Sequence, residues 1–112
     1  MTIHHMNLQP RYFNYIKNGT KRIELRLYDE KRSKIRLGDT IIFSNPKGES
    51  LSTQVIGLLR YTDFESLFQD FSIDLLADKA MSKSELIQVL SDFYPAEIQQ
   101  KQGVLGIRIK PL

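Results

Sequence analysis

Hydrophobic positions follow two different spacings along the chain. Apolar residues occupy every second position in 21–28 and in 104–110, which predicts strands with one buried face and one polar face. The segments 3–8, 40–44 and 51–61 are also predicted strands, and Gly57 inside the last of them indicates a bulge or bend.

Helical spacing separates these strands. Pro10 is typical of a first helical position, and Gly19 is a natural left-handed residue at the end of that helix. Asp63 is expected to cap a second helix, and Ser82 with Glu85 forms the S-x-x-E pattern of a capping box for a third. One or two further helical turns are expected in 96–102.

The order of these elements is strand, helix, three strands, two helices and a strand. Short turns between consecutive strands favour antiparallel pairing, and helices at three separate points favour an α+β fold over a pure barrel. About five strands are enough for a small barrel or a strongly twisted sheet. We expect residues 29–36 to form a charged connection.

Composition narrows the class of protein. A length of 112 residues predicts one domain, residues 1–112, large enough for one core. The absence of cysteine excludes disulfides, thiolate metal sites and a cysteine nucleophile. No basic segment followed by an apolar run begins the chain, and no apolar run approaches the length of a membrane span. We therefore expect a soluble, cytoplasmic protein without a membrane partner.

Charge is unevenly distributed although the net charge is only +3. Residues 1–36 carry nine basic and three acidic side chains, whereas the remainder carries seven basic and ten acidic side chains. Such asymmetry is typical either of a solvated basic face or of a site for an anionic partner.

Three short motifs follow one another along the chain. The first is Gly19-Thr20-Lys21-Arg22-Ile23-Glu24, the second is Gly38-Asp39-Thr40, and the third is Val104-Leu105-Gly106-Ile107. Together they resemble the ASCH family, whose signature is a G-x-K-x-x-E run followed by a G-D turn and a strand. The resemblance implies a PUA-like β-barrel with flanking helices and a cleft beside the G-x-K-x-x-E segment, with RNA or a nucleotide as the expected ligand.

Candidate ligand-binding residues gather around this segment. On an alternating strand Lys21 shares a face with apolar residues, so it either emerges at the edge or sits in a dry cleft, where burial would lower its pKa. Glu24 is expected to pair with Arg22 and Arg26, or to accept a hydrogen bond from a base or a ribose. The proposed set also includes aromatic rings for stacking and basic side chains for phosphates: Lys21, Glu24, Arg26, Tyr12, Tyr28, Lys31 and Arg32.

An enzyme is the alternative function. Some relatives of this architecture are acetylcytidine amidohydrolases, and at least one is a ribonuclease. The resemblance places Lys21 at the catalytic lysine of the amidohydrolases. It also places Glu24 where those enzymes have threonine, and Lys79 where they have glutamate. As an enzyme, the chain would use Lys21 as base or nucleophile and Glu24 as a proton shuttle.

No metal ion or other cofactor is expected. His4 and His5 are adjacent on a predicted strand, so they point to opposite faces and do not form a bidentate site. The sequence contains neither a phosphate-binding loop nor a dinucleotide glycine fingerprint.

Overall fold

The computed structural model describes residues 1–112 and contains one curled sheet with helices at its edges and at one end. The strands are β1 (Ile3–Asn7), β2 (Ile23–Leu27), β3 (Thr40–Ser44), β4 (Ser50–Tyr61) and β5 (Val104–Pro111). The helices are α1 (Pro10–Lys17), α2 (Glu30–Ser33), α3 (Phe64–Asp70), α4 (Ile73–Leu76), α5 (Lys83–Phe93) and α6 (Ala96–Gln102).

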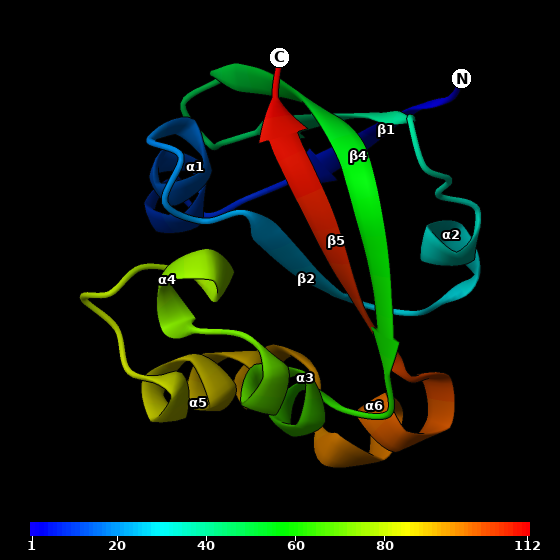
Figure 1. Cartoon of the computed structure of the whole chain (residues 1–112), viewed down its shortest axis with the longest axis vertical. Helices are drawn as coiled ribbons and strands as arrows, with labels where there is room; N and C mark the ends of the chain where they lie inside the picture. Colours follow the sequence, from blue (N-terminus) through cyan, green and yellow to red (C-terminus); the bar gives the residue numbers. More distant parts are fainter.

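The sheet has the order β1-β3-β4-β5-β2 and forms a half-barrel, which confirms the predicted α+β, PUA-like fold (Figure 1). Three of its pairings are antiparallel, but β1 and β3 run parallel. The preference for antiparallel neighbours does not apply to β1, because α1 and β2 separate it from β3 along the chain. A register shift between Val55 and Gly57 confirms the predicted bulge.

The helix signals in the sequence are confirmed in detail. Asp63 caps α3 by accepting a hydrogen bond from the backbone of Ser66, and Ser82 and Glu85 form the capping box of α5. Gly19 follows α1 with φ of 80°. The charged connection instead contains the short helix α2, because Asp29 caps it by accepting from the backbone of Arg32. Helix α4 was not expected as a separate element.

Two hydrophobic clusters fill the interior. One lies within the curled sheet and against α1, whereas the other lies between β2 and the group α3, α4 and α5 at one end of the molecule (Figure 1). Tyr12 packs against both clusters. The seam between the two clusters therefore runs past the start of α1 and along β2. None of the helices is long and apolar enough to cross a membrane.

Candidate functional site

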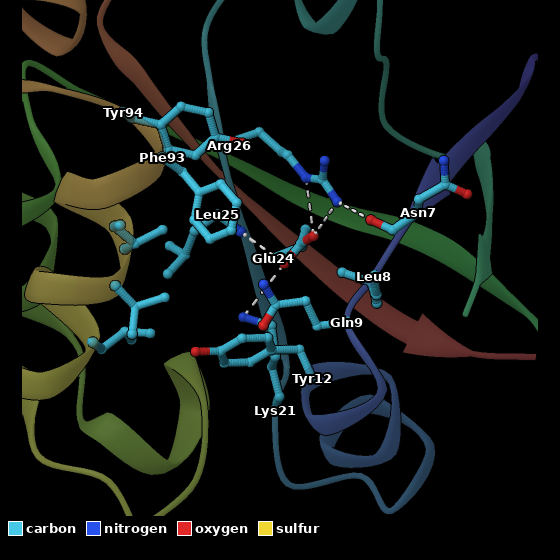
Figure 2. A pocket seen from close by; sticks show the side chains of 13 residues that line it. Asn7, Leu8, Gln9, Tyr12, Lys21, Glu24, Leu25, Arg26, Phe93 and Tyr94 are labelled. Atoms are coloured by element: carbon cyan, nitrogen blue, oxygen red, sulfur yellow. Dashed lines mark hydrogen bonds and ion pairs between the residues drawn. The ribbon is translucent and has the colours of Figure 1, made fainter. Parts of the chain in front are cut away.

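A pocket of about 230 Å³ opens at this seam. The end of β1 and the start of α1 form one side, β2 forms the floor, and the apolar face of α5 forms the opposite side (Figure 2). Leu86, Val89, Leu90 and Phe93 are the apolar residues of α5 that line it. The pocket thus has apolar walls above a charged floor.

The floor is a cluster of three charged side chains, Lys21, Glu24 and Arg26. Lys21 and Glu24 are only 3% and 4% exposed. Oε2 of Glu24 accepts hydrogen bonds from Nε and Nη2 of Arg26 at 3.0 and 2.8 Å. Oε1 accepts from the Leu25 backbone N–H at 3.1 Å and lies 3.5 Å from Nζ of Lys21. One carboxylate therefore balances two cations.

Backbone carbonyls hold Lys21 in place. Its Nζ donates to Ile23 O at 2.6 Å and to Leu76 O at 2.5 Å. Glu24 Oε1 faces the same ammonium at 3.5 Å as an ion pair. The ring of Tyr12 lies 6.0 Å from the same nitrogen and adds a weak cation–π attraction.

Burial and mutual attraction oppose each other in the cluster. Burial lowers the pKa of Lys21, and the nearby Glu24 only partly offsets this effect. Burial alone would raise the pKa of Glu24, but Arg26 and Lys21 outweigh it, so this pKa lies below 4.5. Burial also opposes the charge of Arg26, yet Glu24 outweighs it and the pKa of Arg26 is raised. Glu24 and Arg26 are therefore charged at neutral pH.

The predicted ion pair between Glu24 and Arg26 is present, but the predicted pairing of Glu24 with Arg22 is wrong. Arg22 is exposed and donates to Gly19 O, whereas Lys21 contacts Glu24. The strict alternation that separated Lys21 from Glu24 applies only within a strand, and β2 begins at Ile23. The polar face of β2 is also not solvated, because Glu24 is buried beneath the pocket.

The structure brings four of the seven candidate residues together: Lys21, Glu24, Arg26 and Tyr12 line the pocket. Tyr28 lies outside it, and the guanidinium of Arg60 stacks 3.7 Å from its ring centroid. Arg32 pairs with Asp29 at 2.9 Å, and Lys31 is exposed on α2.

Two aromatic residues of the pocket were missed as site residues. Phe93 and Tyr94 line it from the end of α5, and Phe93 is 60% exposed (Figure 2). In the sequence Phe93 follows the helical spacing of Leu86, Val89 and Leu90, which predicts an inner face for it but does not show that this end of the face stays uncovered. The structure shows a large aromatic ring exposed beside a pocket, and such exposure indicates a binding site.

The two histidines lie apart from the pocket. Nε2 of His4 is 2.9 Å from Oδ2 of Asp39, which also accepts the backbone N–H of Arg36. Oδ1 of Asp39 accepts the backbone N–H of Thr2. These contacts fasten β1 to the turn before β3. No group of three or more His, Cys, Asp or Glu side chains is placed to hold a metal ion.

Comparison with known proteins places the chain in a family. The ASCH domain model matches residues 6–112. The crystal structure of hypothetical protein PH0355 is similar over 99% of this chain and 100% of its own, with 38% identity and a TM-score of 0.89. The solution structure of PF0455 from Pyrococcus furiosus is 36% identical over 99% of this chain and 98% of its own, with a TM-score of 0.79.

More distant similarity extends to a mutant of ZmASCH from Zymomonas mobilis, which shares 13% identity. It aligns with 99% of this chain and 73% of its own, with a TM-score of 0.71, and so supports the fold alone. No curated protein matches the chain. The match of the family model over nearly the whole sequence, together with the half-barrel and its G-x-K-x-x-E segment, shows that this chain belongs to the ASCH domain family.

Proposed function

We propose that this chain binds a nucleotide, alone or within single-stranded RNA, through one base held in the pocket beside Lys21 and Glu24. ASCH domains are generally RNA-binding domains of the PUA-like fold. The observation that carries the proposal is the combination of aromatic and aliphatic walls with a charged floor in one pocket. A nucleobase has the matching chemistry, since its faces are apolar and its edges form hydrogen bonds.

The size of the pocket favours a single base or nucleoside. Its volume of about 230 Å³ lies below the range of roughly 300–1,000 Å³ that is usual for drug-sized ligands. A folded or double-stranded RNA does not fit such a space, whereas an unstacked base does. The exposed ring of Phe93 at the rim provides a surface on which a base can stack.

Residues outside the pocket would contact the rest of the strand. Lys31 and Arg32 belong to the basic segment that follows β2, and Tyr28 lies at the end of that strand. In this proposal they contact the phosphates and sugars of an RNA chain whose base occupies the pocket. Such contacts set position and affinity, while the pocket sets specificity.

A pair of exposed residues offers a matched test that leaves the core intact. Phe93→Ala removes the ring at the rim, and Ile98→Ala removes an exposed apolar side chain of α6 that does not line the pocket. Binding of short labelled RNA should weaken by roughly 1–3 kcal/mol in Phe93→Ala, the usual contribution of one base–aromatic stack. Ile98→Ala should bind as the wild type does.

Salt dependence separates strand binding from base binding. Affinity for short RNA should fall with added salt, with a log–log slope of about −0.7 for each neutralised phosphate, whereas affinity for a neutral nucleoside should not. Absence of binding to every nucleoside and RNA tested, or equal binding by both variants, would refute the proposal.

A small hydrolase is the second candidate, and the burial of Lys21 favours it. Because burial lowers its pKa, Lys21 can lose its proton more readily than a surface lysine and act as a base or nucleophile. Against this role, Lys79 is exposed and does not line the pocket, although the amidohydrolases have their glutamate at that position. Acetylcytidine and short RNA are the substrates to test.

Wild type and Lys21→Ala should be incubated with both substrates while products are followed by chromatography. Cytidine and acetate, or shortened RNA, from the wild type alone would establish an enzyme with Lys21 at its centre. Unchanged substrates would reject the hydrolase and leave the binding function standing. Circular dichroism of Lys21→Ala shows whether a loss of product reflects chemistry or unfolding.

A further inference from the structure

The hydrogen-bonding capacity of the charged floor is almost fully used. A carboxylate offers about four acceptor positions, and Glu24 accepts three hydrogen bonds, from Leu25 and from two nitrogens of Arg26, while its Oε1 also forms an ion pair with Lys21. Lys21 donates to two backbone carbonyls and is turned toward Glu24, with which it forms an ion pair. Because both side chains are almost fully buried and turned toward each other, neither presents a charged group freely to a ligand.

Arg26 is different, because one of its nitrogens has no partner within the cluster. Nε donates to Glu24, and Nη2 donates to Glu24 and to the backbone carbonyl of Asn7. Nη1 makes no such bond (Figure 2), and the Tyr94 hydroxyl is the remaining polar group close enough to help raise the pKa of Arg26. Arg32 Nε is the only buried side-chain nitrogen or oxygen without a partner, so Nη1 of Arg26 is accessible rather than sealed in the protein.

The orientation of Arg26 is fixed by the bonds that it does make. Glu24 holds one edge of the guanidinium at two points and Asn7 O holds Nη2 at 2.9 Å, so the plane cannot turn to present another edge. An arginine side chain has only donors. The floor thus offers the ligand a fixed, positively charged donor and no charged acceptor.

We propose that Arg26 makes this pocket selective for bases whose exposed edge carries carbonyl acceptors, as in uracil and guanine, over bases with an amino group there, as in cytosine and adenine. The inference rests on the proposed function, since it assumes that a base enters the pocket. An amino group facing Nη1 would set donor against donor and leave both desolvated and unpaired. The neutral polar side chains of the lining, such as Gln9 and Tyr94, can both donate and accept, so they do not reverse this preference.

The wild-type protein gives the first test, which needs no variant. Uridine and cytidine differ in whether this base edge carries a carbonyl or an amino group. Guanosine and adenosine differ in the same way. Titration of each nucleoside, followed by NMR chemical shifts, should show uridine and guanosine binding more tightly than their partners by roughly tenfold or more, as for other arginine–base contacts. Equal affinities, or a preference for cytidine and adenosine, would overturn the inference and leave base binding in place.

Inorganic phosphate tests the other ligand that could satisfy an arginine donor. If Arg26 reads a base edge, phosphate at the same concentration should not displace uridine. Displacement by phosphate alone would overturn the inference, because Arg26 would then be a phosphate contact. If neither a nucleoside nor short RNA binds, the proposed function itself fails, which is a different result from the loss of selectivity.

Arg26→Lys and Arg22→Lys form a matched pair of variants. Arg26→Lys keeps a positive charge near Glu24 but removes the rigid planar fork whose two edges hold Glu24 and present Nη1 at the same time. The ratio of uridine to cytidine affinity should fall toward one in Arg26→Lys and stay unchanged in Arg22→Lys, whose side chain is exposed outside the pocket. A ratio unchanged by Arg26→Lys would overturn the inference, and because it is a ratio, a modest loss of stability does not alter it.

Discussion

Replacing Glu24 by glutamine keeps the shape of the side chain and removes the negative charge that two buried cations share. Lys21 and Arg26 would remain side by side as like charges with little access to water. Removing one partner of a buried ion pair typically destabilises a protein by roughly 3–5 kcal/mol. Because glutamine retains one acceptor oxygen for Arg26, we expect a loss of about 3 kcal/mol in the free energy of unfolding.

This loss should depend on pH through Lys21. Burial already places the pKa of Lys21 below 10.5, its ordinary value, and removal of Glu24 would lower it further. Between the folded and unfolded pKa values the unfolded chain binds more protons, so stability rises with pH in that window. This pH window is wider in Glu24→Gln than in the wild type. The difference in the free energy of unfolding between the two proteins should therefore shrink as the pH approaches 10.5.

Urea unfolding followed by circular dichroism measures the effect, repeated from pH 6 to pH 10. At neutral pH the thermal midpoint of Glu24→Gln should fall on the order of 10 °C for a chain of this size. Glu97→Gln is the control, because Glu97 is exposed on α6, and it should stay within about 0.5 kcal/mol of the wild type. A loss below about 1 kcal/mol, or a loss independent of pH, would refute the account of the cluster.

Two further predictions concern the frame around the pocket. In Gly106→Ala the new Cβ would lie 3.0 Å from Cδ1 of the fully buried Leu67, so overpacking should cost roughly 1–3 kcal/mol and lower the urea midpoint at an unchanged m-value. Gly57→Ala should show a loss of the same order, since its Cβ would lie 2.9 Å from Cδ and 3.1 Å from Cβ of Arg108, and that Cβ cannot move without the backbone. A wild-type midpoint in either variant would contradict this reasoning. The His4 side chain and two backbone N–H groups lower the pKa of Asp39 to about 2, so stability should fall as the pH drops from about 4 to about 2. That acid-induced loss should be reduced in Asp39→Asn, as measured by the unfolding midpoint against pH, and a persistent full loss would argue against it.

Local signals in the sequence predicted local structure well. The capping residues Asp63 and Ser82 were identified because a cap depends on side chains within three positions of the helix start. The bulge at Gly57 was predicted for a similar reason, since glycine marks an irregular point within a strand. The five strands and the α+β class follow from the spacing of apolar residues.

Features that depend on distant parts of the chain were not predictable in the same way. One acceptor for Lys21 is the backbone carbonyl of Leu76, and every residue type has such a carbonyl, so no side chain marks it. The contact between Lys21 and Glu24 arises because Lys21 precedes β2 and escapes its alternation. The exposure of Phe93 depends on which helices cover α5, which apolar spacing does not report.

The pocket is assembled from segments that lie far apart in the sequence. Its lining comes from the first and second strands, the first helix and the fifth helix, and Lys21 is fastened to a residue 55 positions away. The unfolded chain therefore has no counterpart of this site, and a ligand of the pocket binds the native state alone. By linkage such a ligand adds about 2.7 kcal/mol of stability at a concentration one hundred times its dissociation constant. A rise in melting temperature across a panel of nucleosides and short RNAs thus ranks candidate ligands directly, without an activity assay.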